Sequence, residues 1–338
     1  MRRKNSGQEH LLIVRFSAMG DVLMSLFAVS ALRKTYPDLK LTIATKPRFA
    51  RFYAGIPDVE VLTLDSEGSL KSLLRLAGQA AASGVTAVAD IHNSLRSGIV
   101  RFCLSFRGVR CAVFRKNRRR RASIKGKGLN ITPFRHNVLK FCDVFARLGY
   151  PVPDPVQERR HLQVPEVFGG KSGRWIGYAP FASKRMKIYP ENLSRQLIDM
   201  MSDSFDRVFI FSGPGRELDF VKEMESVHGN VTGVFGRTDI WGELALMSNL
   251  DAVVTMDSSS MHLASLAGVP LVSVWGATHP AAGFMGYGYD IGKNCIQLDL
   301  PCRPCSIYGE GKCRYGDYRC LSGISPESIM KKLEELIG

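Results

Sequence analysis

The chain has 338 residues, of which 45% are hydrophobic and 23% charged, as is usual for a folded globular protein. Its length predicts two domains of ordinary size, and no apolar run reaches the eighteen or so residues that a membrane-spanning helix needs. With 46 Lys and Arg against 31 Asp and Glu, the formal net charge is +15. This excess indicates an anionic partner: a nucleic acid, a phosphate-bearing substrate or an anionic membrane surface. The polar residues 1–10 lack the apolar core of a signal peptide, so we expect a cytoplasmic protein.

Strand-like and helix-like segments alternate along the first half of the chain. Short apolar runs predict buried strands at residues 11–16, 39–45, 59–64 and 85–91. Helical periodicity predicts helices at residues 22–34, 69–84 and 136–150. Such alternation is typical of a parallel sheet with helices on both faces. Residues 151–173 carry Pro and Gly without a long period, which predicts a linker region between two domains.

The second half repeats this alternation. Strands are predicted at residues 174–181, 207–214, 230–236, 251–257 and 270–276. Helices are predicted at residues 191–202, 216–226, 240–250, 259–268 and 325–338. Ser325 is the expected N-cap of the last helix, with Pro326 at its first position. The sequence therefore predicts an α/β protein with two Rossmann-like halves and a cleft between them.

An aspartate stands where the first predicted strand gives way to a helix. In "RFSAMGDVLMS", residues 15–25, Asp21 follows the single glycine Gly20. One interpretation is an N-cap, whose carboxylate accepts hydrogen bonds from unpaired helical N–H groups. The other is a functional carboxylate at the carboxyl edge of a parallel sheet, where open α/β folds bind ligands. The residue types alone allow both.

Two later segments carry groups suited to phosphate. In "VVTMDSSSMHL" a strand ends at Asp257 and a helix begins near Ser260, so hydroxyls and free N–H groups meet the positive end of the helix dipole. The alternatives are an ordinary capping sequence and, for His262, a core histidine. In "FASKRMKIYPENL" Lys187 is the cation nearest the next helix start, where it could meet a leaving phosphate. An ordinary surface lysine is the alternative.

Several common motifs are missing from the sequence. The first strand–helix turn lacks G-x-G-x-x-G, and no G-x-x-x-x-G-K-[ST] loop occurs, which disfavours nicotinamide enzymes and P-loop ATPases. No Asp-x-Asp element of the kind that holds a divalent ion on a sugar nucleotide is present. The basic stretch 114–128, "FRKNRRRRASIKGKG", predicts a mobile loop, with a merely solvated basic loop as the alternative. Without aromatic residues after Phe114 it does not favour base stacking on nucleic acid.

Four of the eight cysteines are scattered and are expected to be buried or inert: Cys103, Cys111, Cys142 and Cys295. The other four crowd into the region 302–320: Cys302, Cys305, Cys313 and Cys320. In a reducing cytosol such a cluster favours a metal site over disulfides, and four thiolates can bind zinc tetrahedrally. The spacing is not that of a standard double knuckle, so reversible disulfides and four free thiols remain alternatives.

Taken together, these segments resemble glycosyltransferase family 9, the heptosyltransferases of lipopolysaccharide core synthesis. The resemblance runs over nearly the whole chain, through residues 11–45, "DIHNSLRS", "KIYP", "FSGPGRE", residues 257–280 and the cysteine-bearing tail. The elements S-x-M-G-D-V and D-S-x-x-M-H-L are its specific parts. It implies a GT-B fold, in which two Rossmann-like domains with parallel sheets face a central cleft. The implied parts are an N-terminal acceptor-side domain, a C-terminal nucleotide-sugar domain with the cysteine cluster and a final helix, at residues 1–165, 166–322 and 323–338.

The resemblance also implies an inverting transfer that requires no metal or other cofactor for catalysis, structural zinc at the cysteines being a separate expectation. It places the catalytic base on Asp21 and the phosphate-binding lysine on Lys187. The implied donor-binding residues are Gly20, Glu217, Asp257, Ser258, Ser259, Ser260, Met261 and His262. The implied acceptor-binding residues are Ser17, Asn93, Arg96, Arg118, Arg119 and Arg120.

The implied donor is ADP-heptose and the implied acceptor an anionic glycolipid, lipid A–Kdo or inner-core lipopolysaccharide, with no nucleic-acid partner. The enzyme would then touch the cytoplasmic face of the inner membrane from outside the bilayer. Two departures from the family lie on the donor side: Ser259 replaces a glycine, and His279 in "GATHP" replaces an acid. They leave open a GT-B enzyme that uses another nucleotide sugar, for transfer or epimerisation. A basic nucleic-acid-binding protein and a catalytically inactive relative are the remaining alternatives.

Overall fold

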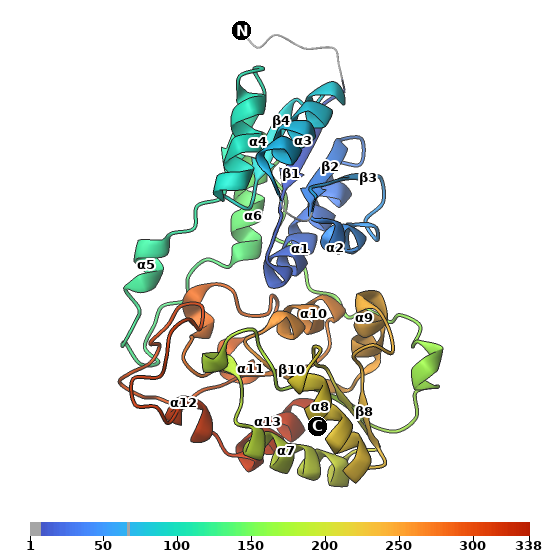
Figure 1. Ribbon diagram of the computed structural model, residues 1–338, viewed down its shortest axis with the longest axis vertical. Helices are drawn as coiled ribbons and strands as arrows, with labels where there is room; N and C mark the ends of the chain where they lie inside the picture. Colours follow the sequence, from blue (N-terminus) through green and yellow to red (C-terminus); the bar gives the residue numbers. More distant parts are fainter. Residues whose placement is uncertain (1–7, 66–67) are drawn as a thin grey trace. The chain divides into compact units, whose positions relative to one another are not determined.

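The computed structural model describes residues 8–65 and 68–338. Residues 1–7, which carry most of the polar N-terminal stretch, lie outside the described part. No helix among the described residues is long and apolar enough to cross a bilayer. Contacts divide the chain into two compact units (Figure 1). The first runs to Lys116 and includes Asn137–Val156, and the second comprises Asn117–His136 and Gln157–Gly338.

The described part of the first unit contains a five-stranded parallel sheet with the strand order β3-β2-β1-β4-β5. Its strands are β1 (His10–Val14), β2 (Lys40–Thr45), β3 (Val59–Thr63), β4 (Ala87–Asp90) and β5 (Arg110–Val113). Its helices are α1 (Met19–Thr35), α2 (Pro47–Ala50), α3 (Leu70–Ala82), α4 (Leu95–Ser105) and α6 (Asn137–Ala146). Successive residues of a strand point to opposite faces, so Leu12 and Val14 pack with α3 and α4. Helices α1 and α6 pack on each other and cover the other face.

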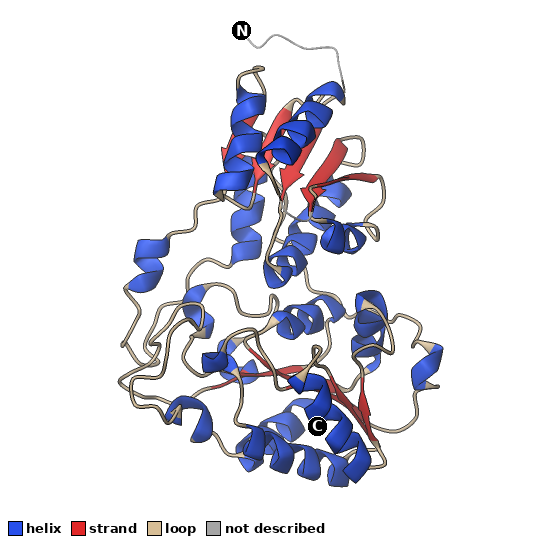
Figure 2. Cartoon of the chain, viewed as in Figure 1, coloured by secondary structure: helices blue, strands red, loops and turns tan. Residues whose placement is uncertain are grey.

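The second unit also contains a sheet flanked by helices (Figure 2). Within the described residues this sheet is parallel and has six strands, in the order β11-β10-β9-β6-β7-β8. Its strands are β6 (Trp175–Ala179), β7 (Arg207–Ile210), β8 (Val231–Gly233), β9 (Ala252–Met256), β10 (Leu271–Val274) and β11 (Cys295–Ile296). Its helices are α5 (Arg118–Ala122), α7 (Glu191–Ser204), α8 (Arg216–Val227), α9 (Ile240–Asn249), α10 (Ser259–Ala267), α11 (Ile291–Asn294), α12 (Arg319–Ser322) and α13 (Pro326–Ile337). Helices α7, α8 and α13 bury one face of this sheet. The predicted cap of α13 is confirmed, since the Ser325 side chain accepts from Ser328 N–H.

Both sheets have a point where the strand order reverses. In the first unit it lies between β1 and β4, and in the second between β6 and β9. Open parallel sheets bind ligands beyond the carboxyl ends of the strands at such a point, because the chain leaves the two strands in opposite directions. Asp21 follows β1, Asn93 follows β4, Lys187 follows β6 and Asp257 follows β9. The expectation of two α/β halves with parallel sheets is confirmed.

The basic segment 117–136 packs with the second unit, whereas we expected residues 1–165 to form one domain. Backbone hydrogen bonds account for this grouping. Gly126 N–H donates to Pro304 O at 3.0 Å, and Gly128 N–H donates to Arg303 O at 2.8 Å. The segment also contains the short helix α5, so the expectation of an irregular mobile loop at 114–128 is wrong for residues 118–122.

Candidate functional site

Asp21 lies in the first turn of α1. The helix begins at Met19 with Ala18 at the N-cap position, so the N-cap interpretation of Asp21 is wrong. A carboxylate in this turn is favoured by the positive end of the helix dipole. Asp21 forms an ion pair with Arg15, whose side chain is only 4% exposed, while the Asp21 side chain remains 35% exposed. The carboxylate is therefore held in place and still accessible to a ligand.

Arg15 connects the ends of the two strands at the reversal point of the first unit. Its Nη1 donates to the carbonyl of Ile91, just after β4, at 2.6 Å. Its guanidinium carbon lies 5.6 Å from the centroid of the Phe141 ring. The sequence contained the signal for this residue, because an arginine inside the apolar run "LLIVRF" is almost never buried without a partner. We did not single it out from the sequence.

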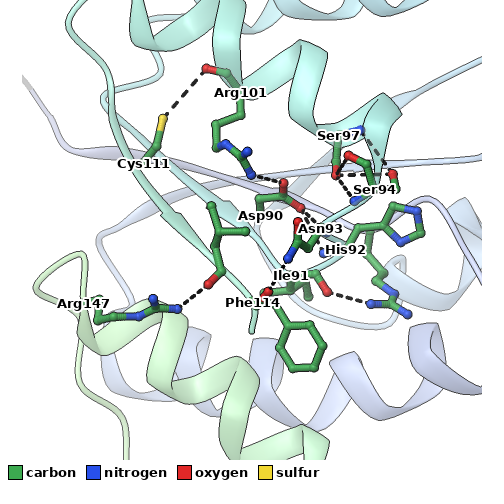
Figure 3. Close-up of polar contacts among 12 residues, drawn as sticks. Asp90, Ile91, His92, Asn93, Ser94, Ser97, Arg101, Cys111, Phe114 and Arg147 are labelled. Atoms are coloured by element: carbon green, nitrogen blue, oxygen red, sulfur yellow. Dashed lines mark hydrogen bonds and ion pairs between the residues drawn. The ribbon is translucent and has the colours of Figure 1, made fainter. Parts of the chain in front are cut away.

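The turn after β4 is organised by the fully buried Asp90 (Figure 3). Its Oδ1 accepts from the N–H groups of His92 and Asn93 at 3.0 and 2.7 Å. Its Oδ2 pairs with Arg101 at 2.7 Å. Asn93 has a φ of 51°, and its side-chain amide donates to Phe114 O at 2.7 Å. The predicted acceptor residue Asn93 thus occupies a fixed left-handed position at the reversal point.

This turn also carries a neutral histidine, His92. Burial, together with the positive charges of Arg15 and Lys116, lowers the pKa of His92 to about 4. Its ring meets Phe16 edge-on with centroids 5.8 Å apart. Of the other predicted residues in this unit, Ser17 and Gly20 are half-buried next to Asp21, and Arg96 is exposed on α4. The structure therefore brings Ser17, Gly20 and Asp21 to one end of β1.

In the second unit the structure joins Lys187 to the predicted donor loop. Lys187 Nζ lies 2.8 Å from Asp257 Oδ2, and the two side chains are 14% and 5% exposed. Thr278 Oγ donates to the same carboxylate oxygen at 2.8 Å. The interpretation of Lys187 as an ordinary surface lysine is therefore wrong. The sequence placed both residues at phosphate but did not reveal that they pair with each other.

The start of α10 contains a buried hydroxyl that the fold does not use. Ser258 occupies the N-cap position, but its side chain makes no capping hydrogen bond. Its Oγ is buried without a hydrogen-bond partner among the described residues. Ser259 and Ser260 are half-buried in the first turn, followed by the buried Met261 and His262. Buried polar groups left unpaired cost free energy, so this hydroxyl favours a polar ligand.

His279 offers a second such donor. Its Nδ1 accepts from Ala281 N–H at 3.1 Å, so the proton of the neutral ring is on Nε2. That atom is buried and has no partner among the described residues. Burial, reinforced by the charge of Arg303, lowers the pKa of His279 to about 4. The ring therefore remains neutral at pH 7, with one unused N–H group.

The other predicted binding residues of this unit fall into two places. Glu217 lies in the first turn of α8, where its Oε2 accepts from Gly213 N–H at 2.6 Å. Arg118, Arg119 and Arg120 are exposed on α5. Their neighbour Arg121 is buried and anchors the helix, donating to Tyr308 Oη at 3.3 Å and lying 5.5 Å from the Phe284 ring centroid. The predicted acceptor residues are thus divided between the two units.

The four clustered cysteines belong to the second unit, where they line one cavity. All four are free thiols. Among residues 8–65 and 68–338, no group of three or more His, Cys, Asp or Glu side chains is arranged so that it could hold a metal ion as it stands.

Comparison with known proteins gives consistent results. Residues 73–314 match the sequence model of glycosyltransferase family 9 (heptosyltransferase). The lipopolysaccharide core heptosyltransferase OpsX of Haemophilus influenzae is 24% identical over 282 residues, which cover 80% of each chain. Among solved structures, the E. coli ADP-heptose LPS heptosyltransferase II has a TM-score of 0.69 at 19% identity, covering 97% of this chain and 98% of its own.

The E. coli heptosyltransferase WaaC with ADP has a TM-score of 0.68 at 19% identity, covering 96% of this chain and 99% of its own. At these identities the structural similarities show the fold alone. They confirm the predicted GT-B fold.

Proposed function

Because the chain belongs to glycosyltransferase family 9, the heptosyltransferases, and is therefore a glycosyltransferase, we propose that it transfers heptose from ADP-heptose to a lipid A–Kdo or inner-core lipopolysaccharide acceptor. The names of similar proteins support this choice of donor and acceptor. One observation supports the proposal: each unit carries polar groups suited to glycosyl transfer at the reversal point of its own sheet. The first unit has the accessible carboxylate of Asp21, and the second has Lys187 with the unused donors of Ser258 and His279.

Asp21 would act as the general base. An acceptor hydroxyl attacks the anomeric carbon from the side opposite the diphosphate, which inverts the configuration at that carbon. Asp21 accepts the hydroxyl proton as the new bond forms, when the hydroxyl has become acidic. A positioned base of this kind contributes roughly 10²–10⁴-fold to the rate. The Arg15 ion pair supports this role because it fixes the orientation of the carboxylate in the open first turn of α1.

The departing ADP would be stabilised by the second unit. Lys187 supplies a positive charge, Ser258 Oγ and His279 Nε2–H supply unused donors, and the N-terminus of α10 supplies backbone N–H groups. Donors already aimed at developing charge are among the most effective catalytic devices, since they need no reorganisation during the reaction. With these groups the leaving diphosphate does not need a divalent ion, so we propose metal-independent chemistry.

The acceptor would be held in part by the exposed side chains of Arg118, Arg119 and Arg120. Guanidinium groups bind phosphates and carboxylates through paired hydrogen bonds, and such groups are abundant on the proposed acceptor. The same arginines would be attracted to anionic lipid. We therefore place the enzyme at the cytoplasmic face of the inner membrane, in contact with its surface.

A second candidate, a GT-B enzyme that uses another nucleotide sugar, is favoured by the two donor-side departures Ser259 and His279. Calorimetric titration without metal, using ADP, UDP, GDP, CMP, ADP-heptose and NAD, separates the two candidates. Selective binding of ADP and ADP-heptose, followed by heptose transfer to a purified lipid A–Kdo acceptor with inversion seen by NMR, is the expected result. Preference for UDP or GDP would contradict the proposed donor. Tight, salt-sensitive binding of arbitrary DNA would instead support the nucleic-acid alternative.

A further inference from the structure

The segment between β11 and α12, residues 297–318, contains no helix or strand. Irregular segments of this length are uncommon inside compact domains unless they have a function or some device that fixes them. This one contains Cys302, Cys305 and Cys313, and Cys320 follows in α12. The role of these cysteines is not explained by the proposed sugar transfer.

The four cysteines share one cavity of about 310 Å³. Met186, Ala277, Tyr315 and Tyr318 also line it, together with Lys125 of the basic segment. All four sulfurs are free thiols, and none is paired in a disulfide. Thiols that approach one space from separate turns of an irregular segment are the arrangement from which a thiolate metal site can be built.

A buried cation beside the cavity provides an independent observation. Arg303, between two of the cysteines, is 0% exposed. Within the described residues its hydrogen bonds go to neutral oxygens: the carbonyls of Gly276, Leu298 and Thr278 and the side-chain amide of Gln297. It forms no ion pair among those residues. A buried charge without an opposite charge is costly in free energy. An occupant of the cavity that turns its thiols into thiolates would supply the opposite charge.

We propose that Cys302, Cys305, Cys313 and Cys320 together bind one thiophilic divalent ion, zinc or ferrous iron, in a tetrahedral site. Binding breaks four S–H bonds, releases four protons to solvent and forms four metal–sulfur bonds. Four thiolates around a divalent ion carry a net charge of −2, which compensates Arg303. Tetrahedral sulfur ligation selects zinc or iron over harder ions.

Because the described thiols are not already gathered as a ligand set, the ion must draw them together. The segment can allow this movement. Gly309, Gly311 and Gly316 lie between the second cysteine and the fourth, with φ values of 80°, 98° and 77°. Glycine adopts such backbone angles without steric cost, so the chain between the ligands can adjust while the first pair stays close to Arg303.

The ion would also fix the turn that carries Lys187. A methyl group added at Gly309 would lie 2.7 Å from the Lys187 side chain, so this glycine packs directly on the lysine. The Arg185 guanidinium lies 4.7 Å from the centroid of the Tyr318 ring. Ser306 N–H donates to Ala277 O at 3.1 Å, beside Thr278. The cysteine segment therefore supports the Lys187 turn from outside, and the bound ion is a positioning device rather than a participant in the chemistry.

Metal analysis of the full-length protein, purified under reducing conditions without added metal, is the first test. We expect about one zinc or iron per chain, and elemental analysis distinguishes the two. Less than about 0.1 ion per chain, both as purified and after dialysis against either ion, would overturn the proposal. Disulfides among the four cysteines in the freshly purified protein would overturn it as well.

Variants then assign the ligands. Cys305→Ser and Cys313→Ser should each reduce the metal content at least tenfold and lower the Tm. The control Cys103→Ser, on α4 of the first unit, should leave the metal content unchanged. In the two ligand variants donor KM should rise and kcat should fall, because donor binding and stabilisation of the leaving group both depend on Lys187, whereas acceptor KM should stay unchanged. Full metal content in both ligand variants would overturn the assignment.

If the ligand variants do not fold, the wild-type protein still provides a test. Stepwise titration with a mercurial reagent should release the ion, detected by a colorimetric chelator, as about four thiols react per chain. Release without reaction of thiols would contradict thiolate ligation. The metal inference does not rest on the proposed sugar transfer, since ion content and thiol reactivity are measured without substrate.

Discussion

The ion pair between Lys187 and Asp257 provides the sharpest quantitative prediction. The two side chains are 14% and 5% exposed, with Nζ and Oδ2 separated by 2.8 Å. At an effective dielectric constant of about 20, the attraction at this distance is about 6 kcal/mol before desolvation is counted. Removing one partner of a buried pair typically costs about 3–5 kcal/mol, because the other charge stays buried alone.

We therefore expect Asp257→Asn, in which the amide oxygen can still accept from Thr278, to destabilise the second unit by about 3 kcal/mol. At about 2–4 °C per kcal/mol for a domain of this size, its Tm should fall by roughly 6–12 °C. A cycle with Lys187→Met and the double variant should give a coupling energy of about 1–3 kcal/mol, measured by urea unfolding at pH 7.5.

The same variants report on the proposed phosphate role of Lys187. ADP should raise the Tm of the parent protein, and Lys187→Met should lose most of that increase, because the diphosphate loses its cation. Glu191→Gln, on the neighbouring exposed surface network, is the matched control and should change neither property. A coupling energy below about 0.3 kcal/mol would show that Lys187 and Asp257 do not stabilise each other. Full ADP stabilisation in Lys187→Met would refute the leaving-group assignment.

Four further predictions concern the proposed base, the acid stability, the metal dependence and the basic surface. Asp21→Ala should reduce transfer by at least 10² while leaving ADP binding intact in calorimetry, and near-parental turnover would exclude it as the base. His279 has a pKa of about 4 when the protein is folded, against 6.5 for the free group. Between these two pH values the unfolded chain therefore binds a proton that the folded chain does not bind. Stability should therefore fall from pH 6.5 to 4, by up to about 3 kcal/mol from this residue. His279→Asn keeps an acceptor for Ala281 N–H and should make the free energy of unfolding less dependent on pH between 6.5 and 4. An unchanged pH dependence would show that the histidine is not buried in its neutral form. Leaving magnesium out of the assay should not change the initial rate, and a magnesium requirement would contradict the metal-independent transfer. The triple variant Arg118→Ala, Arg119→Ala and Arg120→Ala should raise acceptor KM several-fold without affecting ADP binding, and an unchanged acceptor KM would contradict the acceptor role of these arginines.

Local sequence was sufficient for the elements and their class. Apolar runs such as residues 11–16 must be buried on both faces, and this requires helices on both sides of a parallel sheet. The sequence also predicted the cap at Ser325 and the helix start after Asp257, because the signals for a helix end lie in neighbouring residues. The fold and the general location of the site residues at strand ends follow from such local rules.

Contacts between distant residues needed the tertiary structure. The sequence left Asp21 between a cap and a functional carboxylate, and the choice depended on Arg15 and on where α1 begins. The pairing of Lys187 with Asp257 joins residues 70 positions apart, brought together because β6 and β9 are neighbours in the sheet.

The sequence by itself determined which segments form strands and helices, that the sheets are parallel, and which polar residues stand at strand ends. Only the tertiary structure decided which charges meet, that Arg121 anchors the basic segment while its neighbours remain exposed, and that four cysteines share a cavity beside Arg303. The physical reason is the distance along the chain over which each interaction acts. Periodicity and capping act over a few residues, whereas ion pairs and cavities depend on strand order, which places residues far apart in the chain side by side.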